Sequence, residues 1–437
     1  MTQLLLLELN EINFGQVQAY ARLGKLPVLG RLIDRHGLVE TTSEKNYEEL
    51  EPWIQWVTAH TGKPLSDHRV FRLGDIVGRE IEQIWEALEA QGLCVGAISP
   101  MNAKNRCRNA AFFLPDPWTP TAVTGSFLMK KLYQAVAQAV NDNAQSRITP
   151  SSAAWLMAGL GAYARPSNYG RYVGLVGSAA RRRSWARALI LDQLLADIFV
   201  REVKRKRPDF ASLFLNAGAH IQHHYMFNSR VYDGPRTNPE WYVPKSSDPV
   251  LEVYSLYDRI VGDIERAFPR ARLMLATGLH QDPHAEATFY WRLKDHETFL
   301  RKAKVPFQRV EQRMSRDFVV FCADEVEARA AETRFGAIRA ADETPLFEVD
   351  NRGADLFVML TWPKDIDENF TYEVDGVTMP GLREEVSFVA IKNGSHNGIG
   401  YFLDTGVKAA EQERIELREM PRRIADACGA TWAEAGA

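Results

Sequence analysis

The clearest chemical feature of the sequence is a group of three histidines, His220, His223 and His224, within five positions. Imidazole side chains are the commonest metal ligands and proton carriers near neutral pH. The group follows a short apolar run from Phe210 to Leu215, which predicts a buried strand. Ligands of open α/β sheets bind at the carboxyl ends of the strands. The pattern therefore favours a functional site over a loop in which the histidines only pack.

Four more predicted strands end in polar residues. These strands run from Leu4 to Leu9, Leu93 to Ile98, Ala271 to Ala276 and Val386 to Ile391. In the same order, they are followed by Asn10 and Glu11, by Ser99 to Asn102, by His280 to His284 and by Ser395 to Asn397. Because the ends of parallel strands meet at one edge of a sheet, we expect these groups to form one site there.

Strands that alternate with helical patterns predict an α/β fold, with a mostly parallel central sheet and helices on both faces. The predicted core covers residues 1–304 and 380–437. Within it, residues 105–204 show helical patterns and no clear strand, and we expect a helical insertion there. The pattern of predicted strands and helices changes over residues 305–379, which predicts a small α+β subdomain. The 437 residues are enough for such a core with additions.

A run of arginines lies on the expected helical insertion, at Arg181, Arg182, Arg183 and Arg187. Such a run is usually a solvated face, but it is also suited to binding an anion. We predict that Arg181 and Arg182 bind substrate, together with Asn102.

The net charge, the apolar runs and the cysteines limit which partners and which cellular compartment we expect. The net charge of -3 gives no sign of a nucleic-acid partner, and no apolar run is long enough to span a bilayer. The four cysteines match no zinc or redox spacing. We therefore expect a cytoplasmic protein with free thiols. The sequence leaves the oligomeric state open.

Several short motifs, taken in their order, resemble the alkaline-phosphatase superfamily, in particular its type I phosphodiesterase/nucleotide pyrophosphatase branch. The segment from Asn10 to Leu32 resembles the first metal-binding position followed by "GxLPxLxxL". Thr61-Gly62 with Asp67-His68 resembles "TG…HG", and the segment from His220 to His223 resembles "DxxGH". His280 resembles the histidine of "DHG", and His396-Asn-Gly398 the last metal-binding histidine. The resemblance spans about residues 4 to 406 and implies a hydrolase of phosphoesters or phosphodiesters.

The sequence departs from the family pattern at the carboxylates and the nucleophile. The three metal-binding aspartates fall on Asn10, Ala219 and Leu279, and the nucleophile falls on Pro52. A two-metal site needs carboxylates to neutralise two dications. We therefore expect no full dinuclear site and at most one divalent ion, with zinc the first choice. Its predicted ligands are His223, His280, His396 and Asn10.

Three interpretations remain open on the sequence. The favoured one is an enzyme with altered chemistry that acts on a small phosphorylated molecule, with Glu11, Glu51 and His220 as catalytic residues. The second is a non-catalytic protein that keeps a phosphate- or sugar-binding cleft. The third is a transferase in cell-surface carbohydrate or lipid assembly.

Glu51 stands at the predicted N-terminus of a helix that begins at Pro52. A helix N-terminus stabilises negative charge, so we expect the pKa of this carboxylate to be depressed. That would make Glu51 a base, a metal ligand or a nucleophile, or a residue that only complements the helix dipole.

Overall fold

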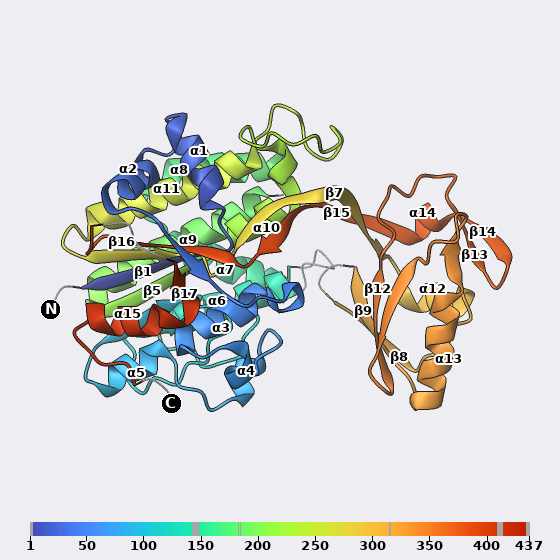
Figure 1. The fold of residues 1–437 in the computed structure, drawn as a ribbon, viewed down its shortest axis with the longest axis horizontal. Coiled ribbons are helices and arrows are strands. Elements are labelled where there is room, and N and C mark those ends of the chain that lie inside the picture. Colours follow the sequence, from blue (N-terminus) through green and yellow to red (C-terminus); the bar gives the residue numbers. More distant parts are fainter. Residues whose placement is uncertain are drawn as a thin grey trace.

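An eight-stranded sheet forms the centre of the larger of two units in the computed structural model (Figure 1). The structure describes residues 3–141, 148–181, 183, 185–313, 316–408 and 414–433. The strands, in spatial order, are β17 (Ile415–Glu416), β2 (Val39–Thr42), β16 (Ile399–Asp404), β6 (Arg272–Ala276), β1 (Leu4–Leu9), β5 (Phe210–Leu215), β3 (Val95–Ile98) and β4 (Phe112–Leu114). β6, β1, β5, β3 and β4 run parallel, and β16 lies antiparallel to β6. The mostly parallel sheet predicted from the sequence is confirmed.

Helices cover both faces of this sheet because its central strands are apolar on both sides. In β1, Leu5, Leu7 and Leu9 join one core, and Leu4 and Leu6 join the other, as the two-residue period of a strand requires. The first core takes side chains from α1 (Phe14–Arg22), α2 (Pro27–His36), α6 (Phe127–Asn141), α9 (Ala186–Lys206), α10 (Ala217–Tyr225) and α11 (Pro249–Ala267). The second takes them from α3 (Pro52–Thr61), α5 (Ile84–Ala90) and α15 (Met420–Ala427). The short helix α4 (Leu65–His68) follows α3.

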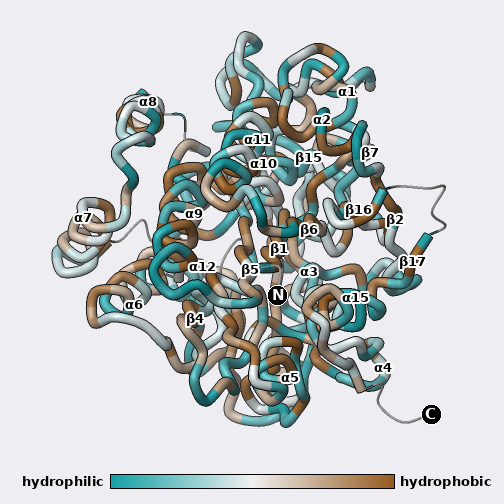
Figure 2. Tube along the Cα trace, turned by 90° about the vertical axis from the view of Figure 1, so that its left-hand side faces the viewer, coloured by the Kyte–Doolittle hydropathy of each residue, from teal (hydrophilic) through white to brown (hydrophobic). Residues whose placement is uncertain are grey.

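The insertion predicted for residues 105–204 is wrong in part. β4 pairs with β3 and forms the edge of the central sheet. α9 packs on the sheet, with Ile198 and Phe199 completely buried, so it belongs to the core. Only α7 (Pro150–Tyr163) and α8 (Tyr169–Ala180) stand outside α9, as Figure 2 shows. The strand was missed because β4 is only three residues long.

The prediction that Val386 to Ile391 lies in the central sheet is also wrong. This segment begins β15 (Val386–Asn397), which pairs antiparallel with β7 (His280–Leu293) in a separate two-stranded ribbon. Several of its side chains are only half-buried, unlike those of β1 or β5. The antiparallel β16 takes the place beside β6 instead.

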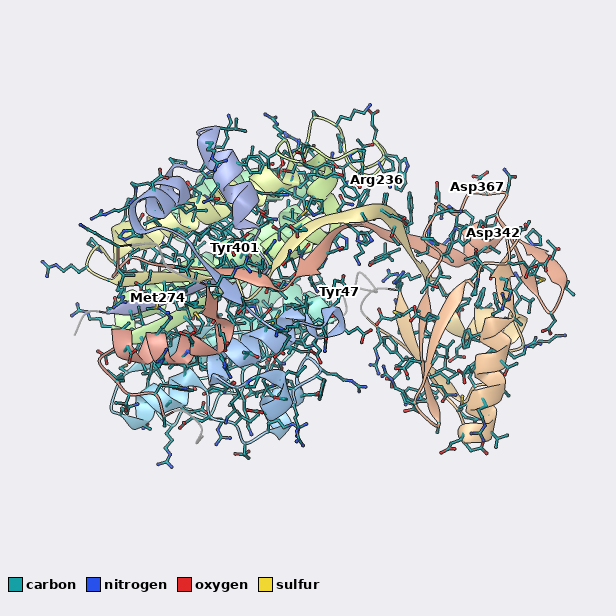
Figure 3. All side chains as sticks on the ribbon, viewed as in Figure 1. Tyr47, Arg236, Met274, Asp342, Asp367 and Tyr401 are labelled. Carbon is teal, nitrogen blue, oxygen red and sulfur yellow. The ribbon has the colours of Figure 1, made fainter. Side chains whose placement is uncertain are left out.

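The ribbon leads to a smaller α+β unit, at the right of Figure 1. This unit contains α12 (His296–Lys302), β8 (Arg309–Gln312), β9 (Asp317–Phe321), α13 (Glu325–Gly336), β10 (Ile338–Ala340), β11 (Phe347–Asn351), β12 (Asp355–Leu360), β13 (Thr371–Val374), β14 (Val377–Pro380) and α14 (Leu382–Glu385). Its own core extends from Trp291 to Val386, beyond the predicted 305–379. Figure 3 places Tyr47 on the side of the large unit that faces the small one.

The four cysteines are free, as expected. No helix in the described ranges is long and apolar enough to cross a bilayer.

One side chain breaks the apolar pattern of β1. Glu8 is completely buried, and its Oε1 lies 2.7 Å from Nε2 of His60 on α3. The His60 ring also contacts Trp85, with ring centroids 4.6 Å apart. An ionisable group in this position is tolerated only with its partner, since a buried charge without one is strongly destabilising.

We therefore expect His60→Leu to lower the free energy of unfolding by about 3–5 kcal/mol, because it leaves Glu8 buried without a partner. The double variant Glu8→Leu/His60→Leu should recover most of that loss. Urea unfolding followed by circular dichroism measures both. Equal losses in the single and double variants would show that the pair has no coupled role.

Candidate functional site

The site is built around Glu11, which follows β1 at the carboxyl edge of the sheet. Its backbone has a φ of 60°, the left-handed conformation that non-glycine residues rarely adopt. Hydrogen bonds hold it there: its N–H donates to Thr277 O, and its carbonyl accepts from Gln281 N and from Gln222 Nε2. A backbone strained in this way persists only where its surroundings fix it, and such residues cluster at functional sites.

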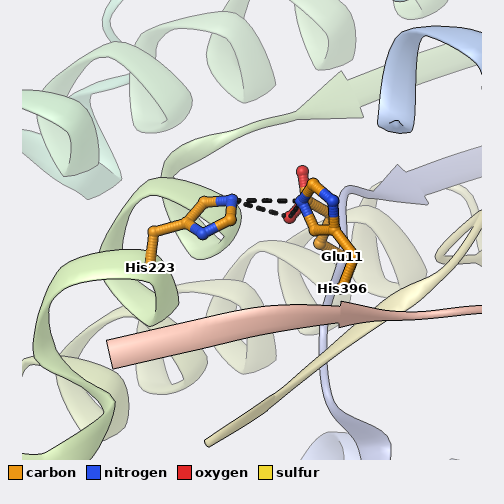
Figure 4. A group of neighbouring side chains, drawn as sticks. All are labelled: Glu11, His223 and His396. Carbon is orange, nitrogen blue, oxygen red and sulfur yellow. Dashed lines mark hydrogen bonds and ion pairs between the residues drawn. The ribbon is translucent and has the colours of Figure 1, made fainter. Parts of the chain in front are cut away.

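Two imidazoles share one oxygen of the Glu11 carboxylate (Figure 4). Oε2 lies 3.1 Å from Nε2 of His223, on α10, and 3.1 Å from Nε2 of His396, on β15. The two Nε2 atoms are 3.3 Å apart. Glu11 is almost fully buried, whereas His223 is about one third exposed, so the cluster can be reached from solvent on the side of His223.

These three atoms are spaced as ligands of a single small divalent ion would be. Zinc binds histidine nitrogen and carboxylate oxygen at about 2.0–2.2 Å, so neighbouring ligands in octahedral to tetrahedral arrangements lie about 2.8–3.6 Å apart. The separations of 3.1, 3.1 and 3.3 Å fall in this range. Two histidines and one carboxylate are also a ligand set that leaves coordination positions open in catalytic sites. Glu11, His223 and His396 therefore form a group that could hold one ion.

The charges in the cluster stabilise one another. Burial alone would raise the pKa of Glu11, but His396 and His223 outweigh it and hold that pKa well below its usual range. Burial would likewise lower the pKa of His396, yet the Glu11 carboxylate, aided by Glu51, raises it. A carboxylate that stays ionised and lies beside two imidazoles is a suitable anionic ligand for a cation.

Two amide side chains orient the Glu11 carboxylate. Gln281 Nε2 donates to Glu11 Oε2 at 2.5 Å, and Asn10 Nδ2 donates to Oε1 at 3.0 Å. The oxygen of Asn10 accepts from Trp56 Nε1 at 2.7 Å. Asn10 therefore positions the carboxylate, and its role as a metal ligand stays a prediction. Its Nδ2 also donates to Asn216 at 2.8 Å, so Asn10 and the start of α10 share one edge of the sheet.

The start of α10, which carries His223, is held by Asp192 of α9. Oδ2 of Asp192 accepts from Ala217 N at 2.8 Å and from the Tyr257 hydroxyl at 2.7 Å. Burial raises the pKa of Asp192 to about 6, although these hydrogen bonds oppose the shift. The orientation of His223 thus depends on a contact between α10 and α9, the helix that precedes β5.

His280, predicted as a third imidazole ligand, lies outside the cluster. Its Nδ1 lies 2.5 Å from the carbonyl of Ile399, and its Nε2 lies 3.1 Å from Asp282. On β7, Gln281 points to Glu11, and the neighbouring His280 points to the opposite side because side chains alternate along a strand. That part of the prediction is wrong by one residue of register.

The other predicted residues are dispersed. His220 lies one turn before His223 on α10, and its ring contacts His224 at 4.9 Å, without a hydrogen bond or ion pair to the cluster within the described ranges. Asn102 is completely buried and ties Gly74 to Trp53, and its role in substrate binding stays a prediction. Arg181 is exposed at the end of α8, and Arg182 lies outside the described residues.

Glu51 does lie beside the cluster, with its Oε2 3.9 Å from Nδ1 of His396. The expectation of a depressed pKa is wrong. Burial raises the pKa of Glu51, and the nearby Glu11 charge raises it further, against the opposing effect of His396. Its side chain makes no capping hydrogen bond to α3, so the helix terminus contributes less than expected. A carboxyl group with a raised pKa holds a proton more readily than an ordinary one, which suits it to proton transfer.

Lys392 is a residue that the sequence prediction missed. It lies on β15, close enough to His396 and Glu51 to influence the pKa of each. Burial lowers its own pKa, and so does Arg316 of the smaller unit. No ion pair involving Lys392 occurs in the part of the chain that the structure describes. A lysine interrupting the apolar run before His396 was the available signal.

Comparison with known proteins found similar structures but no similar sequence. No protein-family model matches the chain, and no curated protein matches its sequence. The structure is similar to phosphonoacetate hydrolase from Sinorhizobium meliloti 1021, with 13% identity, a TM-score of 0.44, and coverage of 98% of this chain and 96% of that one. It is also similar to human ectonucleotide pyrophosphatase/phosphodiesterase 5, with 10% identity, a TM-score of 0.45, and coverage of 100% and 97%. Function is argued below from the side chains.

The electrostatic coupling in the cluster can be tested by Glu11→Gln in metal-free protein. Removing the carboxylate charge should lower the pKa of His396, because that charge is what raises it. NMR titration of the imidazole protons follows the change. The matched variant Glu325→Gln, in the smaller unit, should leave the His396 titration unchanged. An unaltered titration in Glu11→Gln would contradict the arrangement.

Proposed function

We infer that the chain is a hydrolase that uses one divalent ion to act on a phosphoester of a small molecule. The observation that carries this proposal is the convergence of Glu11 Oε2, His223 Nε2 and His396 Nε2 to within 3.3 Å of one another. Zinc is the first choice, because the set of two histidines and one glutamate is known from catalytic zinc sites. When bound, such an ion would supply Lewis-acid chemistry.

The chain itself supplies the groups that handle protons and substrate charge. Glu51 would take a proton from the attacking water and return it to the leaving oxygen, since burial raises its pKa above that of an ordinary carboxyl group. Lys392, with Arg316 nearby, would bind the phosphate, because both cations are without an ion-pair partner among the described residues. Pro52 has no nucleophilic group, so direct attack by water fits the site better than a covalent intermediate.

The metal proposal predicts one equivalent of zinc in protein purified without chelator, measured by elemental analysis. Glu11→Gln, His223→Ala and His396→Ala should each lower the zinc content by at least about tenfold. His280→Ala and His36→Ala should keep it, because neither histidine belongs to the cluster.

Retention of zinc in all three cluster variants would overturn this assignment. So would stoichiometric iron in place of zinc, since the same ligand set serves iron oxygenases. Protein that contains no metal and cannot be loaded with any would support the non-catalytic interpretation.

Turnover can be tested with bis(p-nitrophenyl) phosphate and p-nitrophenyl phosphate. Glu51→Gln should lower kcat by about 10²–10⁴-fold without changing the zinc content, because it removes the group that moves protons. Lys392→Ala should mainly raise KM, whereas Lys392→Arg should keep part of the affinity. Unchanged kcat in a folded Glu51→Gln variant would leave Glu51 without a catalytic role.

A further inference from the structure

We propose that the face formed by α6, α7 and α8 binds the surface of a membrane that contains anionic phospholipids. These helices lie on one side of the large unit, and α7 and α8 are its outermost elements there (Figure 2). Three observations carry the proposal: the distribution of charge along the chain, the exposed apolar side chains on these helices, and a basic cavity beside α8.

Basic residues are concentrated in this part of the sequence. Between Asp116 and Asp192 the chain contains nine lysines and arginines and a single acidic residue, Asp142, which gives a net charge of +8. The whole chain carries -3, so the rest of the protein is strongly acidic. The exposed Arg181 and Arg187 make no ion pair with any described residue. Each such cation near an anionic bilayer contributes about 1 kcal/mol to binding.

The same helices expose apolar side chains that a water-facing surface would not need. Phe127 on α6 and Met157 on α7 are each 67% exposed, and Val173 on α8 is 73% exposed. Ile148, Tyr169 and Val176 are also more than half exposed. Phe127 contacts Trp155, a residue type enriched at bilayer interfaces, with ring centroids 5.9 Å apart. Apolar side chains surrounded by lysines and arginines are typical of segments that lie in the membrane interface.

A cavity of about 390 Å³ beside α8 offers a place for a phosphate headgroup. Its lining includes four arginines, Arg171, Arg183, Arg230 and Arg259. Arg183 pairs with Glu252 at 3.2 Å, Arg171 lies 3.6 Å from Asp263, and Arg230 lies 4.0 Å from Asp248. Arg259 makes no ion pair with any described residue. Ser247, 5% exposed, also lines the cavity, and its hydroxyl has no hydrogen-bond partner in the described ranges. A buried hydroxyl without a partner destabilises a protein unless a ligand satisfies it.

An anionic bilayer fits this face better than a second copy of the chain. Two copies facing each other would bring together like charges, which costs several kcal/mol. The bilayer provides both negative charge for the arginines and apolar depth for Phe127, Met157 and Val173.

The test is co-sedimentation of the full chain with vesicles of phosphatidylglycerol or of phosphatidylcholine. We expect binding to phosphatidylglycerol that weakens as salt is raised, and at least tenfold weaker binding to phosphatidylcholine. Val173→Glu/Val176→Glu should weaken binding at least tenfold, whereas Val377→Glu, at a 60% exposed valine of the smaller unit, should not. Ser247→Ala should weaken binding severalfold and raise Tm without vesicles, because it removes the unpaired hydroxyl.

The proposal is overturned if the chain binds neither vesicle, or if Val173→Glu/Val176→Glu binds phosphatidylglycerol as well as the unaltered chain does. It is also overturned if light scattering shows a dimer that this double variant converts to a monomer, because the occupant of the face would then be a second copy. Unaltered vesicle binding by Ser247→Ala would exclude the cavity as the headgroup site.

Discussion

The shared carboxylate oxygen of Glu11 is the interaction on which the rest of the site depends. Glu11 is buried at the end of the central strand, in a left-handed backbone conformation, and two imidazoles approach the same oxygen. A buried carboxylate would be strongly destabilising without these partners. The two histidines lie 173 residues apart in the sequence, so the contact also fastens β15 to α10 at the sheet edge.

The residues around Glu11 hold its carboxylate and its backbone in place. Gln281 and Asn10 fix the orientation of its carboxylate, and Gln222 and Gln281 fix its backbone. Asp192 fixes the start of α10 and with it His223. A site built from residues held in this way loses little freedom when it binds an ion, which favours affinity and a single geometry.

The ribbon formed by β7 and β15 connects the cluster of Glu11, His223 and His396 to the smaller unit. β15 carries His396 and Lys392, β7 carries Gln281, and the far ends of both strands enter the core of the α+β unit. Arg316 from that unit reaches the electrostatic range of Lys392. The smaller unit therefore contributes to the charge near the site, which its sequence position alone does not suggest.

The sequence by itself determined the central strands and the edge at which polar residues gather. Leu4 to Leu9 and Phe210 to Leu215 are mostly apolar on both faces, and such runs predict buried strands with helices on either side. Glu11 and His223 were found because they follow these strands, His396 because it follows the predicted strand from Val386 to Ile391, and Glu51 because it precedes a helix. Only the tertiary structure decided which of these groups meet. One residue of strand register separates Gln281, which contacts Glu11, from His280, which does not. Burial beside a second carboxylate reversed the expected pKa shift of Glu51, because desolvation depends on packing that no local pattern encodes.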